Sequence, residues 1–358
     1  MARRYSMVAA FAGLVVAIQV ATYLAGAPYH LTQLTMTAYY SLLIVGLCML
    51  IGYAGQISLG HAGFFAIGGY VSSFLTTHDL AAHKGLRLVA LLQKAGMLLE
   101  RSDLYGGSHL VVHPWLACAA AVLLAVVIAY VVGGPVLKLR GHYLAMATLG
   151  FGIIIYRVAL GTELLGAADG ISEVPGFPLP FGLIISGNAS VRVSNYYLAW
   201  GLVILGMVLL LNLIQSRVGR ALSAVHGAED AAGAIGIPTA RYKLNTFVLS
   251  AAFASVAGVF LTHYNGGIGP SEASVMKSVR YVAIVAIGGM ANLWGALLMS
   301  LVLNYLSLRG YFGTFDDAVF GVILILIMLF APDGLLRRHI LADLKRLASG
   351  GASDEEAA

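Results

Sequence analysis

The longest polar stretch in the second half of the chain runs from Ser216 to Lys243 and reads SRVGRALSAVHGAEDAAGAIGIPTARYK. It lies between two segments that contain no Lys, Arg, Asp or Glu, Asn195–Ile214 and Leu244–Thr262. Each of these segments is long enough to cross a hydrocarbon layer of about 30 Å at about 1.5 Å per helical residue. The polar stretch is therefore predicted to be a short helical element at a membrane face.

Basic residues gather beside the predicted helix ends on the side of this stretch. Positive charge next to transmembrane helices favours the cytoplasmic side, so residues 216–243 are predicted to form a cytoplasmic loop. Twelve of the 21 basic residues fall on that same side: Arg3, Arg4, Lys138, Arg140, Arg217, Arg220, Arg241, Lys243, Arg337, Arg338, Lys345 and Arg346. This distribution reports membrane topology, and it predicts no nucleic-acid partner despite the net charge of +5.

The composition is that of a membrane protein. Of 358 residues, 59% are hydrophobic and 10% are charged, and the mean hydropathy is +0.87. Soluble domains carry about 25% charged residues, so the chain is predicted to be an all-α polytopic bundle surrounded by membrane lipid. Cys48 and Cys118 lie in apolar runs without a second Cys or a His at metal spacing, which predicts neither a disulfide nor a metal site.

The N-terminal segment imitates a signal peptide. Arg3 and Arg4 precede an apolar run, Met7–Gly26, and Ala25-Gly26-Ala27 resembles a cleavage triplet. The run is longer than a normal signal core and further spans follow it, so it is predicted to be the first transmembrane helix.

An uncharged break follows. No Asp, Glu, Lys or Arg occurs between Tyr5 and His78, although Tyr53–His61 (YAGQISLGH) is polar and helix-breaking. A loop in water normally carries charge, so the sequence predicts a break within the membrane between short helices at Tyr39–Gly52 and Ala62–Thr77. The alternative is an interfacial turn whose glycines allow close helix packing.

A second break has the same character. Tyr281–Leu308 carries no charge, yet residues 288–295 (GGMANLWG) interrupt it. Further crossings are predicted at Trp115–Leu137, Tyr143–Leu160 and Ala318–Ala331, with an external loop over Gly161–Ser194.

The topology follows from the cytoplasmic placement of both termini, Lys138, Arg140 and the 216–243 loop. Parity gives about ten crossings if each broken segment is a hairpin, and about eight with re-entrant pieces otherwise. The prediction is a bundle of about 8–10 transmembrane helices with broken or re-entrant helices over residues 1–338, followed by a cytoplasmic tail over residues 339–358.

Several blocks of the sequence resemble those of one protein family and occur in the same order as in that family. Within the cytoplasmic loop, Asp230, Ala231, Ala232 and Gly236 resemble the acidic-Ala-Ala-x-x-x-Gly coupling motif of bacterial ABC importer permeases. GYAGQISLGHAGFFAIGGY (Gly52–Tyr70) resembles the signature of branched-chain amino acid ABC permeases of the LivM type. The blocks that follow it are LKLRGHYLAMATLGFG, GISEVPG, SRVGRALSAVHGAEDAAGAIGI, RYKLNTFVLSAAFASVAGVF, GGMANLWGALL and FAPDGLL. The resemblance covers most of the chain from Tyr39 to Arg338.

The resemblance implies an inner-membrane permease subunit of an ATP-driven importer of branched-chain, small aliphatic amino acids in a bacterium. Its implied partners are ABC ATPase subunits, a homologous second permease and a periplasmic substrate-binding protein. A short cytoplasmic helix is predicted over Glu229–Ile237, and the residues expected to couple to an ATPase are Glu229, Asp230, Ala231, Ala232, Gly236 and Ile237. The acidic pair would meet basic groups on that partner, and the small residues, Gly236 among them, would let its surface approach the helix closely. Urea or a short-chain amide is the alternative substrate, because importers of these compounds use related permeases. Ile153 stands where permeases of this family often have an acidic residue, which leaves the exact substrate open.

Residues 78–113 depart from the family pattern. This segment is longer and more charged than the family leads us to expect, and its Leu86–Leu99 run is amphipathic at helical spacing. It is predicted to be an external insertion. Its four basic residues, Lys84, Arg87, Lys94 and Arg101, oppose that placement.

The sequence contains none of the nucleotide-binding or catalytic motifs considered for it. A G-x-x-x-x-G-K-[ST] loop, H-E-x-x-H and G-x-S-x-G are all lacking, so the chain is predicted not to be an enzyme, and ATP is expected to bind to partner subunits. A stand-alone secondary transporter or channel is the alternative class, and it would need a coupling-ion site.

Five polar residues are candidates for the translocation pathway: Gln56, Ser58, His61, Arg157 and Asn292. An ionisable group at the membrane centre costs at least about 2.5 kcal/mol and is a functional hypothesis by default. The structural alternatives are that His61 caps a helix, and that Arg157 snorkels or pairs with Glu163.

Overall fold

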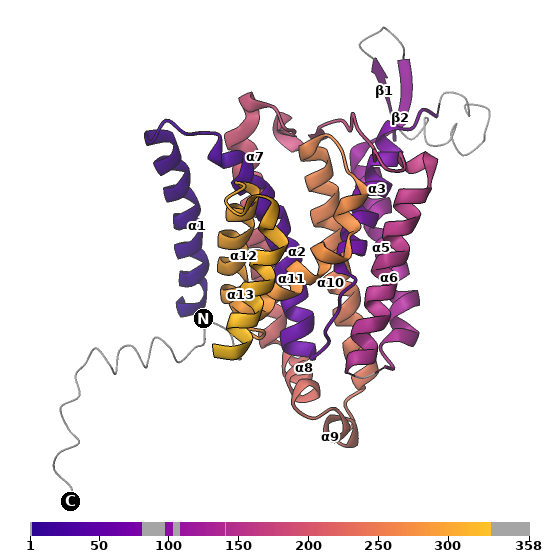
Figure 1. Cartoon of the computed structure of the whole chain (residues 1–358), viewed down its shortest axis with the longest axis vertical. Coiled ribbons are helices and arrows are strands. Elements are labelled where there is room, and N and C mark those ends of the chain that lie inside the picture. Colours follow the sequence, from indigo (N-terminus) through magenta and orange to yellow (C-terminus); the bar gives the residue numbers. More distant parts are fainter. Residues whose placement is uncertain (1, 81–96, 103–107, 140, 331–358) are drawn as a thin grey trace, which may run out of the picture.

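The computed structural model describes residues 2–80, 97–102, 108–139 and 141–330, which form a helical bundle (Figure 1). Among the described residues, six helices contain segments long and apolar enough to cross a membrane: α1 (Ala2–Leu24), α2 (His30–Ala54), α5 (Pro114–Val136), α6 (His142–Gly161), α7 (Arg192–Gln215) and α10 (Thr239–Asn265). Shorter helices that pack among them are α3 (His61–Thr77), α11 (Val275–Gly288), α12 (Leu293–Leu308) and α13 (Asp316–Phe330). The predicted all-α polytopic bundle with broken helices is confirmed.

Helix α2 is the centre of the bundle. Every residue from Thr37 to Gly52 is buried, and α7, α10 and α12 pack around it. The short helix predicted at Tyr39–Gly52 is therefore too short, since α2 begins at His30. Its first turns are helical because Leu31, Leu34 and Ala38 lie at helical spacing and are buried.

The two ends of the bundle carry different elements (Figure 1). Helices α8 (Arg217–Gly227) and α9 (Glu229–Ala234) lie at one end. At the other end lies an antiparallel hairpin of β1 (Leu98–Ser102) and β2 (Ser108–Val112), in which Leu98 pairs with Val112. The loop between α6 and α7, with the short strands β3 (Phe177–Pro178) and β4 (Ile184–Ile185), lies at the hairpin end as well.

Some sequence predictions fall outside the described residues. These include most of the amphipathic run Leu86–Leu99, of which Leu98 and Leu99 begin β1, together with Arg140 and the tail at 339–358. The placement of residues 78–113 outside the membrane stays a prediction, although the described part of the segment lies at the end opposite α8 and α9.

The first predicted break is present between Ala54 and His61. Helix α2 ends at Gly55, which has a left-handed backbone (φ +67°), and α3 starts at His61. The His61 ring binds Ser250 of α10 at 2.8 Å. At about 1.5 Å per residue, Ser250 lies about 16 Å from the α9 end of α10. Helix α3 therefore begins inside the bundle, where neighbouring helices satisfy the broken backbone.

The second predicted break separates α11 from α12 at residues 289–292. Tyr53 Oη donates to the Ala291 carbonyl at 2.9 Å, which places this break beside the last turn of α2. Tyr305, near the other end of α12, contacts His30 at the first turn of α2 through a 2.7 Å hydrogen bond. Helix α12 therefore runs antiparallel to α2 along most of its length.

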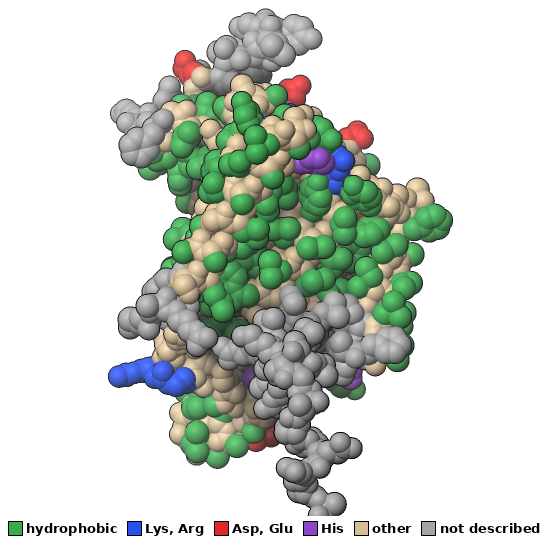
Figure 2. Space-filling view, turned by 90° about the vertical axis from the view of Figure 1, so that its left-hand side faces the viewer, with side chains coloured by type: hydrophobic (Ala, Val, Ile, Leu, Met, Phe, Trp, Pro, Cys, Tyr) green, Lys and Arg blue, Asp and Glu red, His purple; other side chains and the backbone are tan. Residues whose placement is uncertain are grey.

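The outer face of the bundle is apolar. Figure 2 shows hydrophobic side chains across the middle of one face and charged side chains toward the two ends. Large exposed side chains elsewhere include Leu123 and Val131 of α5 and Ile154 of α6. An apolar surface of this extent is stable only against lipid or another subunit.

Candidate functional site

Helix α8 packs one apolar face against the end of the bundle. Ser216 is its N-cap, and its Oγ accepts a hydrogen bond from the Val218 N–H at 3.1 Å. Leu222 and Val225, on one face of α8, are buried. This amphipathic helix carries α9 out beyond the transmembrane helices (Figure 1).

Helix α9 is shorter than the predicted helix over Glu229–Ile237, since it ends at Ala234. Gly236 has φ +87°, a left-handed conformation that suits glycine. The Ile237 N–H donates to the Ala232 carbonyl at 3.0 Å, and the Gly236 N–H donates to the Gly233 carbonyl at 3.0 Å. This pair of bonds is a Schellman cap, so Gly236 ends the helix.

The predicted coupling residues do not all face outward. Asp230, Ala231 and Gly236 are exposed, whereas Ala232 is buried and Ile237 is half-buried. Ile235 was not among the predicted residues, yet 76% of its surface is exposed at this tip. The only signal available in the sequence was its position among the small residues of the coupling motif, Ala231 to Gly236.

Glu229 has a partner within the chain. Its carboxylate forms an ion pair with the Lys243 ammonium near the start of α10, and both side chains are largely buried. Glu229 therefore ties the start of α9 to α10 in this structure. Its predicted contact with an ATPase stays a prediction.

The polar residues of the first break are deeply buried. His61 lies between two hydroxyls, with Nδ1 2.9 Å from Ser58 Oγ and Nε2 2.8 Å from Ser250 Oγ. The His61 side chain does not cap α3, since Gly60 is the N-cap residue and the Ser278 hydroxyl accepts from the Ala62 N–H at 3.2 Å. Gln56 is also buried, and its side-chain amide has no hydrogen-bond partner among the described residues.

The remaining pathway candidates lie apart. Asn292 is half-buried in the second break, at the N-cap position of α12. Arg157 is exposed on α6, and within the described residues no ion pair joins it to Glu163. The structure brings Gln56, Ser58 and His61 together in one break, and the roles of all five residues in translocation stay predictions.

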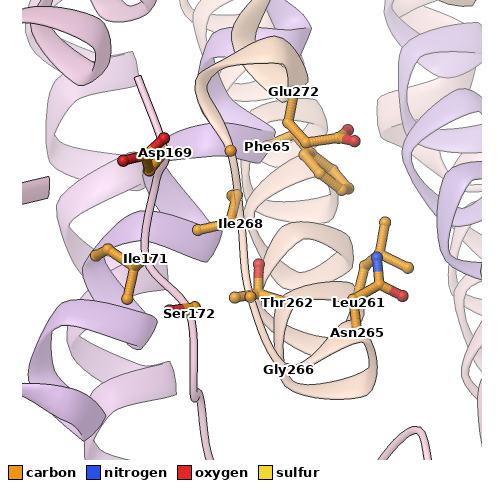
Figure 3. Close-up of a pocket in the computed structure, with 12 residues that line it drawn as sticks. Phe65, Asp169, Ile171, Ser172, Leu261, Thr262, Asn265, Gly266, Ile268 and Glu272 are labelled. Atoms are coloured by element: carbon orange, nitrogen blue, oxygen red, sulfur yellow. The ribbon is translucent and has the colours of Figure 1, made fainter. Parts of the chain in front are cut away.

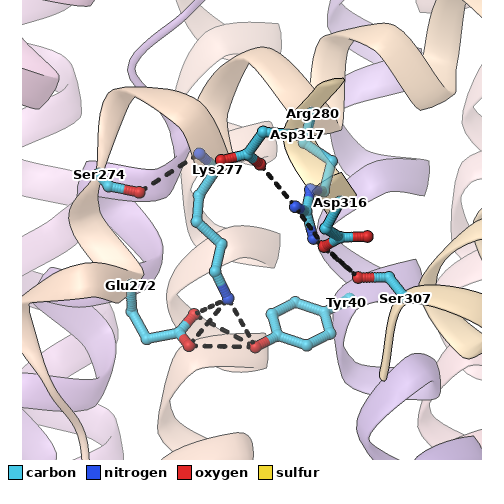
Figure 4. A network of polar contacts seen from close by, with 8 residues as sticks. All are labelled: Tyr40, Glu272, Ser274, Lys277, Arg280, Ser307, Asp316 and Asp317. Atoms are coloured by element: carbon cyan, nitrogen blue, oxygen red, sulfur yellow. Dashed lines mark hydrogen bonds and ion pairs between the residues drawn. The ribbon is translucent and has the colours of Figure 1, made fainter. Parts of the chain in front are cut away.

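The structure contains a partly buried ion cluster that the sequence did not predict (Figure 4). Lys277 Nζ lies 2.9 and 3.1 Å from the two Glu272 carboxylate oxygens and 3.1 Å from Tyr40 Oη. The Tyr40 hydroxyl also lies 3.2 Å from each Glu272 oxygen. The signal available in the sequence was the run of charges from Glu272 to Arg280 between two uncharged segments.

A second cluster lies beside the first. Arg280 of α11 pairs with Asp316 at 2.6 Å and with Asp317 at 2.7 Å, at the start of α13. Arg280 also donates to Ser307 Oγ at 2.9 Å. These contacts hold α11, α12 and α13 together.

A cavity of about 370 Å³ lies between the α6–α7 loop and the segment that follows α10 (Figure 3). We call it the loop cavity. Its lining includes Asp169, Ile171, Ser172, Leu261, Ile268 and Glu272. Ile171 and Ile268 exchange two backbone hydrogen bonds of 2.9 Å, so the loop is held directly against the segment after α10. Glu272 belongs both to this cavity and to the ion cluster.

Comparison with known proteins gives one family. The model of the branched-chain amino acid transport system permease component matches residues 29–331. The chain is 31% identical over 344 residues to the high-affinity branched-chain amino acid transport system permease protein LivM of Escherichia coli K12, covering 90% of this chain and 73% of that protein. It is 28% identical to LivH of Salmonella typhimurium, over 87% of this chain and 96% of LivH. BraD of Pseudomonas aeruginosa is 27% identical over 87% of this chain and 97% of BraD. No solved structure matches.

Proposed function

We propose, from the premise that this chain belongs to the family of branched-chain amino acid transport system permease components, that it carries branched-chain amino acids through a bacterial inner membrane. The observation that carries the proposal is the family match over residues 29–331, which includes both broken helices and the α8–α9 segment. The names of the relatives LivM, LivH and BraD support the substrate class.

The proposed partners are two ATPase subunits, a second permease and a periplasmic binding protein. The exposed basic residues Arg217, Arg220 and Arg241 at the α8–α9 end favour a cytoplasmic position for that end. The binding protein then docks at the hairpin end. The chain contains no phosphate-binding loop, so ATP hydrolysis belongs to the partner subunits, and this chain is not an enzyme.

The structure supports a mechanical route from α9 to the broken helices. The ion pair between Glu229 and Lys243 joins α9 to the beginning of α10. Further along α10, Ser250 binds His61 at the start of α3. A displacement of α9 by an ATPase therefore moves a rigid helix that is bonded directly to the first break. Alternating access by such rearrangement needs no ion site.

Uptake measurements test the substrate. A strain lacking this chain is compared with the same strain expressing it, using labelled leucine, isoleucine, valine, urea and lysine. We expect branched-chain uptake to require the chain and urea and lysine uptake to be unaffected. Loss of urea uptake with unchanged leucine uptake would overturn the substrate and leave the permease role standing. Leucine uptake by the purified chain alone in vesicles would indicate a secondary transporter.

Ile235 provides the test of coupling. An exposed apolar side chain at a subunit contact is a candidate anchor, and placing a charge there opposes burial. Ile235→Asp is expected to reduce stimulation of ATP hydrolysis by loaded binding protein about tenfold or more. Ile235→Leu, the matched control, is expected to retain it. Full stimulation in the Asp variant would contradict the proposed contact.

A further inference from the structure

We infer that the ion pair of Glu272 and Lys277 beside the loop cavity is a binding site of the permease for the zwitterionic head of an amino acid. Glu272 accepts hydrogen bonds from the α-ammonium group, and Lys277 donates to the α-carboxylate. The aliphatic side chain lies against Ile171, Leu261 and Ile268 of the cavity. The inference rests on the proposed function and names the site at which the substrate leaves water.

The Glu272–Lys277 pair lies well along α2 from its N-terminal end. Tyr40, which contacts both charged groups, lies about 15 Å along α2 from His30 at about 1.5 Å per residue. Ionisable residues at such depth are expensive and mark substrate pathways by default.

The Glu272–Lys277 pair is also partly accessible. The side chains of Lys277 and Glu272 are 25% and 20% exposed, so the pair is not sealed in the core. Glu272 lines the cavity together with Asp169 and Ile268. A ligand in the cavity therefore contacts Glu272, whose carboxylate lies 2.9 Å from Lys277 Nζ.

The charge pattern fits a zwitterion. A bound amino acid replaces one internal ion pair by two external ones, and no net charge enters the membrane. Tyr40 Oη lies within 3.2 Å of Glu272 and 3.1 Å of Lys277, so it can keep a hydrogen bond to either group as they separate. The nearby Tyr281 hydroxyl is buried with no hydrogen-bond partner among the described residues, and its ring centroid is 6.1 Å from that of Tyr40. It is a further donor beside the pair.

The cavity also selects by size and polarity. A volume of about 370 Å³ lies near the small end of the usual range for ligand sites, roughly 300–1,000 Å³. Ile171, Leu261 and Ile268 offer aliphatic contacts, while Asp169 and Glu272 are the charged residues of its lining. Two carboxylates attract an ammonium group and repel acidic side chains. The site therefore suits small aliphatic amino acids.

Protection of a single thiol from labelling tests this site. The complete transporter carries Ser172→Cys, because Ser172 is exposed and lines the cavity, with Cys48 and Cys118 replaced by Ala. A small maleimide labels position 172 in nanodiscs without binding protein, while leucine, leucinol or 4-methylpentanoate is added. We expect leucine to slow labelling in a saturable manner. Leucinol lacks the carboxylate and 4-methylpentanoate lacks the ammonium group, so each is expected to protect at least about tenfold less well.

Variants assign the protection to the ion pair. Glu272→Gln and Lys277→Gln are each expected to raise the half-protecting leucine concentration about tenfold or more, since each removes a charge-assisted hydrogen bond. Glu272→Asp keeps the charge and is expected to retain saturable protection. If the Gln variants fail to assemble, Glu272→Asp still tests whether a carboxylate at position 272 supports protection. Asp317→Asn is the matched control, because Asp317 belongs to the neighbouring cluster and not to the cavity lining, and its protection is expected to equal wild type.

The outcomes separate this inference from the proposed function. Leucine uptake is measured with the same transporter before labelling. Leucine uptake without protection of position 172 from labelling overturns the proposed site and leaves the proposed function standing. Equal protection by leucine, leucinol and 4-methylpentanoate, or unchanged protection in Glu272→Gln, has the same consequence. A transporter with no leucine uptake overturns the proposed function, and its labelling then shows separately whether the cavity binds leucine.

Discussion

Gly52 lies so close to the Met290 carbonyl that a Cβ atom at position 52 would overlap it. This contact joins the last turn of α2 to the break between α11 and α12. Cys48, one turn earlier, donates its S–H to the same carbonyl at 3.4 Å. The last two turns of α2, just before the first break, are therefore in direct contact with the second break at the α8 end of the bundle.

Gly52→Ala is expected to destabilise the bundle. The added methyl group has no room against a backbone carbonyl, and overpacking of this kind costs about 1–3 kcal/mol. The measurement is the thermal unfolding midpoint in detergent. Gly201→Ala is the matched control, since Gly201 lies in the α7 helix with open space around it, and this change is expected to be neutral or stabilising. Equal midpoints for the two variants would contradict the close contact.

Gly236 is expected to be required for its backbone conformation as well as for its size. A left-handed backbone costs an ordinary residue about 1–2 kcal/mol, while Asn tolerates it better. Gly236→Ala should therefore lower stimulated ATP hydrolysis more than Gly236→Asn, although Asn is larger, and a bulky β-branched residue should abolish it. If the loss follows side-chain volume alone, the cap is not what coupling needs. Membrane insertion is the control in each case.

The two breaks are expected to change accessibility with nucleotide. Ser58 is buried and Asn292 is half-buried, so Ser58→Cys and Asn292→Cys should react with small polar thiol reagents at rates that differ between nucleotide states. The background lacks Cys48 and Cys118. Asn188→Cys is the control, because Asn188 is exposed in the α6–α7 loop, outside both breaks, and should react equally in all states. Complete labelling at positions 58 and 292 by bulky impermeant reagents in every state would place these residues in ordinary exposed loops.

The ion pair of Glu229 and Lys243 is expected to hold α9 in place. Partly exposed ion pairs contribute up to about 1 kcal/mol, so Glu229→Gln should speed amide hydrogen exchange over residues 229–237 about fivefold. The double variant with Lys at position 229 and Glu at position 243 should restore slow exchange. Unchanged exchange in the single variant would show that α9 is held by other contacts.

The sequence by itself determined the membrane class, most helices and both breaks. An uncharged apolar run of about 20 residues is long enough to span the hydrocarbon layer, and in lipid it must be helical because an unpaired backbone group is costly there. Such a run is recognised from consecutive residues alone. It placed α5, α6, α7 and α10 within a few residues of their bounds and found the α8–α9 segment. It also identified Gly236, although the prediction assigned the residue to close partner approach and the structure shows a helix cap.

The tertiary structure alone decided which distant residues meet. Tyr40 reaches Glu272 across 232 residues, and His61 reaches Ser250 across 189. No local pattern encodes these pairs, because they depend on how helices of similar apolar character pack around α2. The same packing pairs Glu229 with Lys243 and leaves Ile235 exposed. A charge or an apolar side chain becomes a site only when the surrounding helices set its depth and its partner.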